Sequence, residues 1–455
     1  MHPYPIGNGT LAPNIPREFA ALMDALQLRG ANTDALLQLE RRDWERLLDF
    51  CDLAHLTLTL AQVNSSDFPT WVVRRLERNV ADNALRYARV RTAYAEAAEA
   101  LRNARISHLV LKGFTQAPDY VRNPRYRVQS DIDFYCPQNQ VAKAEEALQE
   151  IGYKPVGGID YQFADHTPTL NRPGNWEPNG NMYDPEMPPS IEVHFCLWNE
   201  RTSFIKICDF EHFWERRVTR RLDDISFPAL SPVDQLGYFA LHVVRGIICG
   251  DWVVHHAYEL AVFLESRMED DQFWKEWETI HSSSLRTLEA IAFWLAQAWF
   301  SCTIHPSLRK AIESMPKAQR EWLERFGGSP LEVMFRPNKD GRLLQLLLMQ
   351  SWSARRKVLR NTMIPVSFIG IIRPRFPTKN RRDLTSVYQN RHIAYFVHLV
   401  DRAASKLYST TRFLSHGVCL WLSRRPTRAQ FLLFLAASFF LTSAWPHTSS
   451  CSTSS

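Results

Sequence analysis

The repeat of apolar residues changes abruptly near Ser107, and this change limits the folds that the chain can adopt. Residues 71–104 contain no Gly or Pro and are rich in Ala, Arg, Glu and Leu, which predicts one long helix or two helices joined end to end. Ser66 or Asp67 is the expected N-cap, with Pro69 near the first turn. Beyond Ser107, short apolar runs between loops take over, namely HLVLK, DIDFYC and SIEVHF. We therefore expect an α+β fold, with a small mixed sheet between helical parts.

The region of short runs contains one predicted helix and further strands. Residues 139–151 (NQVAKAEEALQEI) predict an amphipathic helix that Gly152 closes, and residues 153–156 return as a strand. Residues 157–189 are rich in Gly, Pro, Asn and Asp, which indicates irregular loop around one or two short strands. In SIEVHFCLW the apolar residues alternate with polar ones and place the carboxylate of Glu192 on the second face of a strand.

A chain of 455 residues is too long for one ordinary core, because single cores usually stop growing near ~250–300 residues. Strand-like segments are expected only in the second of four parts, and from residue 209 the pattern is read as helical again. The expected parts are an N-terminal helical module (1–104), a core with the sheet (105–230), a second helical module (231–350) and a basic, helical C-terminal region with an apolar tail (351–455). In the last part a further helical stretch is expected to start at Asp383.

Composition indicates a packed protein in a reducing compartment. The apolar fraction is 45%, near the globular average, so disorder does not describe most of the chain. Eight cysteines are scattered without a C-x-x-C pair. The N-terminus lacks the basic start, apolar stretch and cleavage site of a secretory signal, so we expect a cytoplasmic protein. A net charge of +6 permits an anionic substrate or a membrane surface and requires neither.

The C-terminal tail holds an uncharged run of 15 residues, FLLFLAASFFLTSAW, at 431–445. It is shorter than the ~20 residues that span a bilayer comfortably, which favours a buried terminal helix. The alternative is a membrane anchor or an interfacial helix with Arg424, Arg425 and Arg428 on the cytoplasmic side. Peripheral or C-terminal membrane association therefore stays open.

The run DIDFY carries the chemistry that the sequence suggests most directly. Residues two apart in a strand face the same side, so Asp131 and Asp133 project together while Ile132 and Phe134 bury the other face. Two carboxylates are the ligands that Mg²⁺ takes from a protein beside phosphates and water. By itself D-x-D is a common pattern with little specificity. Glu192, from a neighbouring strand, would complete a two-metal site, act as a general base, or simply be an exposed strand residue.

The order of the motifs adds to this interpretation. Five features follow one another along the chain: LVLKGF, an Arg-rich loop, SDIDFY, a helix and IEVHF. In this order the chain resembles the uncharacterised nucleotidyltransferase family of the DNA-polymerase-β-like superfamily. The matching residues are Leu111, Lys112, Gly113, Tyr120, Arg127, Ser130, Asp131, Ile132, Asp133, Glu192, Val193 and His194. The resemblance covers about 105–265 and reaches His242, Trp252 and AYELAVFL, where Glu259 stands at a position that is more usually Asp.

The resemblance implies a polymerase-β-like core that transfers a nucleotidyl group from a nucleoside triphosphate (NTP) to an acceptor, with Mg²⁺ or Mn²⁺. It implies that Asp131, Asp133 and Glu192 bind metal and act in catalysis. It also implies that Lys112, Gly113, Arg127 and Ser130 bind the NTP. One departure matters: the superfamily places Gly-Ser or Gly-Gly before the acidic pair, whereas this chain has Lys112-Gly113-Phe114. The usual hydroxyl contact to the triphosphate is therefore in question.

Several residues have a second interpretation. Lys112 is either a cation beside the phosphates or a solvated strand end, and Gly113 either admits phosphates or only makes a turn. Arg125 and Arg127 either grip phosphates or hold their loop by pairing with Asp119. A zinc site at the three histidines of the second helical module is disfavoured, because imidazoles on amphipathic helices are usually packed and hydrogen-bonded. These histidines are His242, His255 and His256.

Two other functions remain open. The first is a catalytically inactive nucleotide- or protein-binding member of the same fold. The second is an RNA-modifying nucleotidyltransferase. Nucleic acid is not favoured as a partner, because the basic cluster at 355–382 lies far down the chain and no aromatic RNA-reading motif accompanies it. The acceptor, a small molecule or a protein, does not follow from the sequence.

Overall fold

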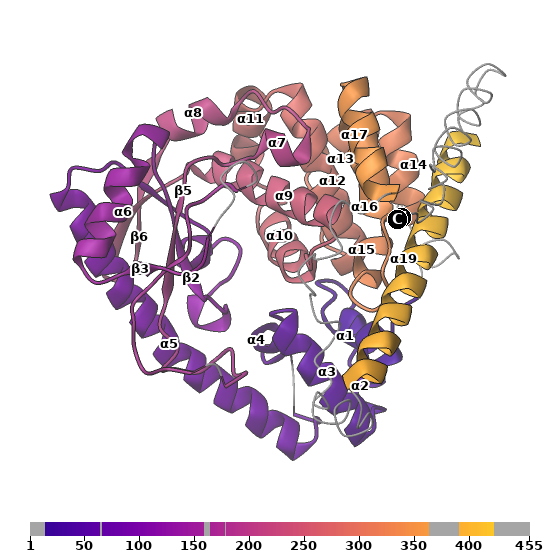
Figure 1. Cartoon of the computed structure of the whole chain (residues 1–455), viewed down its shortest axis with the longest axis horizontal. Coiled ribbons are helices and arrows are strands. Elements are labelled where there is room, and N and C mark those ends of the chain that lie inside the picture. Colours follow the sequence, from indigo (N-terminus) through magenta and orange to yellow (C-terminus); the bar gives the residue numbers. More distant parts are fainter. Residues whose placement is uncertain (1–13, 64–65, 159–163, 178, 364–390, 423–455) are drawn as a thin grey trace, which may run out of the picture.

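The computed structural model describes residues 14–63, 66–158, 164–177, 179–363 and 391–422 (Figure 1). Four short helices open the chain: α1 (Arg17–Ala25), α2 (Asp34–Leu37), α3 (Arg41–Leu53) and α4 (Thr57–Leu60). The predicted long helix is confirmed, because α5 runs unbroken from Thr70 to Asn103. The predicted cap is wrong: Pro69 is the N-cap residue, and it has no side-chain hydrogen bond to the first turn.

The sheet has five strands in the order β1-β2-β5-β4-β3. Its strands are β1 (Leu109–Leu111), β2 (Asp131–Tyr135), β3 (Lys154–Pro155), β4 (Leu170–Asn171) and β5 (Ser190–His194). The central pair β2 and β5 is parallel, and the other pairs are antiparallel. The fold is thus mixed, with a small mixed sheet and flanking helices. In the central pair Asp133 lies opposite Glu192, and Asp131 lies opposite Ser190.

One face of the sheet is buried under α5 and α6 (Val141–Glu150), as Figure 1 shows. Ile132 and Phe134 of β2, with Ile191 and Val193 of β5, are fully buried in that apolar cluster. Because strand side chains alternate between faces, this packing directs the acidic residues of both strands to the opposite face. The period-2 pattern in DIDFY and SIEVH thus decides which side of the sheet carries the carboxylates.

A hairpin of β6 (Val218–Leu222) and β7 (Ile225–Ala229) corrects the expectation of helix from residue 209 onwards. Its loop is Asp223-Asp224, and Asp223 has φ +52°, a left-handed conformation that Asp tolerates. Phe227 and Ala229 are buried in the cluster behind the sheet, while the first strand is largely exposed. Before the hairpin lie two short helices, α7 (Glu200–Ser203) and α8 (Phe210–Glu215).

The remaining helices form the second half of the molecule (Figure 1). They are α9 (Pro232–Cys249), α10 (Val254–Ser266), α11 (Asp271–Ile280), α12 (Ser283–Phe300), α13 (Pro306–Ser314), α14 (Lys317–Phe326), α15 (Ser329–Glu332), α16 (Asp340–Leu348), α17 (Trp352–Met363) and α19 (Arg391–Leu422). The N-terminal helices pack on this half, since the rings of Phe19 and Phe50 lie 5.1 and 5.3 Å from that of Phe335. One apolar core therefore joins the two helical parts, and the division of the chain at 104 and 230 stays a prediction.

A buried ionic cluster ties α9 to the helices that follow it. Asp234 accepts two hydrogen bonds from Arg216, at 2.9 and 2.6 Å. His281 lies between Asp234 and Glu289, with Nε2 at 3.4 Å and Nδ1 at 2.8 Å from their oxygens. Burial opposes the charged imidazole, but Glu289 and Asp234 outweigh it and raise the pKa of His281 to about 9. The imidazole is therefore a cation held between two carboxylates at neutral pH.

None of the helices that the structure describes is both long and apolar enough to cross a membrane. The run at 431–445, whose alternatives are a buried helix and an anchor, lies outside the described residues. So do the three arginines that precede it. The predicted helix start at Asp383 falls in the same undescribed part, and α19 is described from Arg391.

Candidate active site

Three side chains from the two central strands converge on the face of the sheet opposite α5 and α6. Asp133, Glu192 and His194 each offer a ligand atom, and these atoms all lie within 4.8 Å of one another. Nε2 of His194 lies 2.8 Å from Oδ1 of Asp133 and 3.8 Å from Oε2 of Glu192. The structure thus brings together two of the three predicted carboxylates. Asp131 is not part of this set, and His194, one of the residues that match the family, takes the third place.

Lys112 stands at the end of β1 and faces the acidic strand. Its Nζ lies 3.4 Å from Oδ2 of Asp133, and both side chains are largely buried. Burial would raise the pKa of Asp133, but Lys112 and His194 bring it below its usual range. The pKa of Asp131 instead rises to about 6, first through burial and then through the charge of Asp133. Asp133 is thereby the firmly ionised member of the pair.

The turn after β1 is held by Gln129. Its Oε1 accepts a hydrogen bond from the backbone N–H of Phe114 at 3.0 Å, and its Nε2 donates to the carbonyl of Asp131 at 2.8 Å. Gly113 has φ +58°, and a Cβ there would lie 2.2 Å from Nε2 of Gln129. The glycine is therefore required by the packing of Gln129 between the turn and β2. Close approach of phosphates to Gly113 stays a prediction.

Replacing Gly113 with Ala is expected to destabilise the protein by about 2–4 kcal/mol. About 1 kcal/mol comes from the positive φ, and the rest from the collision with Gln129. Gly152→Ala is the matched control, because Gly152 also has positive φ, +94°, but open space around its Cβ position. Urea unfolding followed by circular dichroism measures both. Equal losses in the two variants would contradict the packing role of Gly113.

Arg127 forms an ion pair with Glu259 of α10, with Nε and Oε1 2.8 Å apart. The predicted alternative partner is wrong: Asp119 pairs instead with Arg220 at 3.0 Å and Arg267 at 3.1 Å. Glu259 could not be identified from the sequence as the partner of Arg127, because the two residues lie 132 positions apart. Ser130 is exposed directly before β2, and its carbonyl accepts from the backbone N–H of Ser190 at 3.1 Å.

Sequence reasoning missed two residues that adjoin the cluster. His166 places its Nε2 3.7 Å from Oε2 of Glu192, and its backbone forms a bridge with His194. Asp165 is buried beside it and pairs with Arg245 of α9. Both lie in the irregular segment between two strands, where no periodicity marks which side chains point inward. Only the bridge to β5 brings them to the site.

Comparison with known families places the chain in one of them. A family model described as an uncharacterised nucleotidyltransferase matches residues 40–301, more than half of the chain. The chain belongs to the uncharacterised nucleotidyltransferase family. Searches of curated proteins and of solved structures find no match. The match begins just before α3 and ends after α12, so the matched region includes helices on both sides of the sheet as well as the strands.

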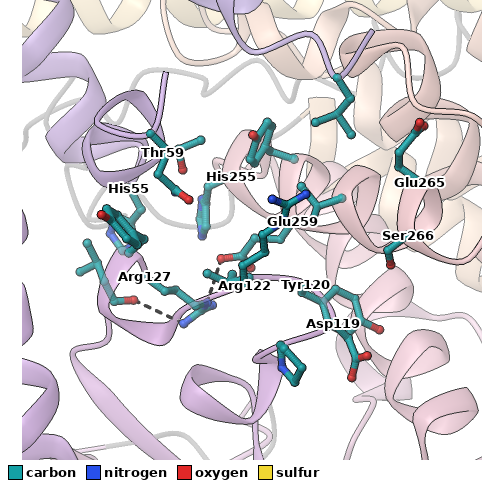
Figure 2. Close-up of a pocket in the computed structure, with 18 residues that line it drawn as sticks. His55, Thr59, Asp119, Tyr120, Arg122, Arg127, His255, Glu259, Glu265 and Ser266 are labelled. Carbon is teal, nitrogen blue, oxygen red and sulfur yellow. Dashed lines mark hydrogen bonds and ion pairs between the residues drawn. The ribbon is translucent and has the colours of Figure 1, made fainter. Parts of the chain in front are cut away.

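Next to the Arg127–Glu259 pair, the protein has a cavity of about 590 Å³ (Figure 2). Its walls come from the loop 118–128, from α10, and from the N-terminal helices through His55, Thr59 and Gln62. The rings of His55 and His255 lie 5.0 Å apart. Burial, with Arg127 nearby, lowers the pKa of His55 to about 4, and burial also lowers that of His255, so both imidazoles are neutral.

Proposed function

We propose that this protein transfers a nucleotidyl group from an NTP to an acceptor molecule, with a divalent metal ion at the face of the sheet opposite α5 and α6. The single observation that carries the proposal is the convergence of Asp133, Glu192 and His194 beside Lys112. Membership of a nucleotidyltransferase family supports it. The identity of the NTP and of the acceptor is left to experiment.

The donor set fits a divalent cation. Two carboxylates supply hard oxygen ligands, as Mg²⁺ prefers, and the imidazole of His194 adds a nitrogen ligand that suits Mn²⁺ better than Mg²⁺. Glu192 is oriented for this role, because its Oε1 accepts a hydrogen bond from Thr169 at 2.8 Å while Oε2 faces the histidines. Asp131, one strand repeat away on the same face, would bind on the side of the triphosphate.

In the proposed reaction each residue has a distinct part. The bound metal neutralises charge on the triphosphate and activates the acceptor oxygen. Lys112 is the counter-ion of Asp133. If a metal ion neutralised the carboxylate of Asp133, the ammonium of Lys112 would be free to contact a phosphate oxygen. Arg127, held by Glu259 in the loop before β2, would supply positive charge to the triphosphate. Ser130 and Gly113 are the other residues that would bind the triphosphate.

A catalytically inactive protein of the same fold would not need the same arrangement of side chains. A protein that only binds a nucleotide or a partner has no need to hold two carboxylates and a histidine within 4.8 Å, backed by a buried lysine. A catalytic role is therefore the better account of this geometry. No observation at the site favours an RNA acceptor.

The test incubates the purified protein with Mg²⁺ or Mn²⁺, each α-labelled NTP in turn, and a cell lysate separated into small-molecule, protein and RNA fractions. We expect metal-dependent release of pyrophosphate and transfer of label into the small-molecule or protein fraction. Label that appears only in RNA would favour the RNA-modifying alternative. Tight metal and NTP binding without any transfer would favour the inactive one.

A further inference from the structure

Two polar side chains of α5 are buried against the loop that precedes β2. Asn83 and Arg86 are each 1% exposed and lie on the same face of the helix, three residues apart. Asn83 donates from Nδ2 to the carbonyls of Arg125 and Arg127, at 2.7 and 3.1 Å. Arg86 donates from Nε to the carbonyl of Gln129 at 3.1 Å. Two side chains of one helix therefore hold three alternate carbonyls of the loop.

The loop carbonyls have no backbone partner of their own. None of the carbonyls of residues 125, 127 and 129 accepts a hydrogen bond from a backbone N–H of the described residues. Backbone carbonyls are strong acceptors that a folded chain needs to pair. The side chains of α5 thus do for this loop what a neighbouring strand does for a strand in a sheet.

Arg86 also reaches the segment before β5. Its Nη1 donates to the carbonyls of Met187 and Asp184, at 2.9 and 3.4 Å. Gln129 lies shortly before β2 and Met187 shortly before β5, so one guanidinium joins the starts of the two central strands. Burial lowers the pKa of Arg86 to about 10, against the charges of Asp131 and Asp184, so the side chain stays a cation at neutral pH. Charged donors make the stronger hydrogen bonds.

The residues whose backbones α5 holds belong to the proposed NTP site. Arg127 would supply charge to the triphosphate, and its carbonyl is held by Asn83. Its side chain is directed to α10 by an ion pair (Figure 2). Gln129 is held by Arg86 and in turn donates from its own side chain to the carbonyl of Asp131 at 2.8 Å. Loss of the contacts with α5 would therefore release Arg127 and the start of β2.

We propose that Asn83 and Arg86 are positioning residues for the proposed reaction: they hold the loop 125–129 so that Arg127 and Asp131 meet the triphosphate in one fixed arrangement. This role rests on the proposed transfer function. Both residues act through the backbone of the loop and not by contact with a substrate. Asn83 holds Arg127, so its loss should weaken NTP binding and spare the metal cluster. Arg86 also joins the two central strands, so its replacement should affect metal binding as well.

Asn83→Ala is the decisive variant, because it removes both bonds to the loop and leaves no buried charge. Asn79→Ala is the matched control: Asn79 is a buried asparagine one turn earlier on α5, and it makes no hydrogen bond to the loop among the described residues. Leu101→Ala controls for lost stability, since Leu101 is fully buried behind the sheet at the far end of α5. Arg86→Lys keeps the charge but not the fork of donors.

Two binding measurements separate the roles. Calorimetry with Mn²⁺ follows the binding of the unreactive α,β-methylene analogue of each ribonucleoside triphosphate, and electron paramagnetic resonance follows Mn²⁺ without nucleotide. We expect at least one analogue to bind the wild type, and to bind Asn83→Ala about tenfold more weakly while Mn²⁺ binding is unchanged. Arg86→Lys should weaken both. Asn79→Ala and Leu101→Ala should keep the Kd of the wild type for the analogue.

A merely structural role predicts a different result, namely a smaller fraction of binding-competent protein with an unchanged Kd. That result for Asn83→Ala would overturn the proposal, as would an equal rise of Kd in Leu101→Ala. A wild type that binds no analogue would overturn both this proposal and the transfer function. Analogue binding that depends on Asn83, without any transfer of label, would leave the positioning role standing and defeat the transfer function.

Discussion

Asp133→Asn is expected to lower metal-dependent NTP turnover by about 10³-fold or more, because it removes the carboxylate on which Lys112, His194 and the proposed metal all depend. Asn keeps the shape of the side chain but not its charge. Mn²⁺ binding, followed by electron paramagnetic resonance, should weaken in parallel with turnover. Asp131→Asn is expected to abolish turnover as well.

Asp133→Asn also leaves Lys112 buried without its counter-charge, so a companion variant is needed that leaves this pair intact. Glu192→Gln serves, because Glu192 does not contact Lys112, and its turnover loss should be similar or smaller. Glu146→Gln, an exposed change on α6, is the control and should have no effect. Turnover that survives unchanged in both Asp131→Asn and Asp133→Asn would place the site elsewhere.

The free energy of unfolding is expected to fall by about 3 kcal/mol between pH 6.5 and pH 9, through His281 alone. In the folded protein its pKa is about 9, whereas an unfolded histidine titrates near 6.5. Below pH 6.5 both states are protonated and the full stabilisation is present. As the pH rises from 6.5 toward 9, His281 loses its proton in the unfolded state but keeps it in the folded state. Folding then requires the uptake of a proton, so the free energy of unfolding falls as the pH rises.

Urea unfolding at pH 6.5 and pH 9.5 measures this loss, with His281→Gln as the reference for all other titrating groups. The difference in pH dependence between wild type and variant isolates His281. Glu289→Gln removes one of the two carboxylates that hold the imidazole, so it should move the transition toward neutral pH. An identical pH dependence in wild type and His281→Gln would show that the buried cluster does not hold a cation.

The strands that carry the carboxylates were predictable because their signal is local. Alternation within DIDFY and SIEVH decides which residues are buried, and it needs no knowledge of the rest of the chain. The hairpin at 218–229 was missed although Ile225, Phe227 and Ala229 alternate, since Pro228 argues against a strand and the partner strand has no apolar face. Both strands of the hairpin are edge strands, and an edge strand tolerates a proline and a polar partner.

The composition of the candidate metal-binding cluster was less predictable than its location. The side chain of His194 reaches Asp133 because the register pairs Asp133 with Glu192, and register is a non-local property. The ion pair of Arg127 with Glu259 and the approach of His166 likewise depend on contacts between segments far apart in sequence. Sequence patterns identify which residues carry chemistry, whereas tertiary packing decides which of them meet.

The cavity is lined by segments that lie far apart in the sequence and are brought together by the shared apolar core. His55 and Gln62 come from the first helices, Tyr120 and Arg127 from the loop after β1, and Glu265 from α10. The loop between β1 and β2 contributes one wall of the cavity. The cavity is consequently formed only when the N-terminal helices, this loop and α10 fold together, so the strand region alone could not contain it.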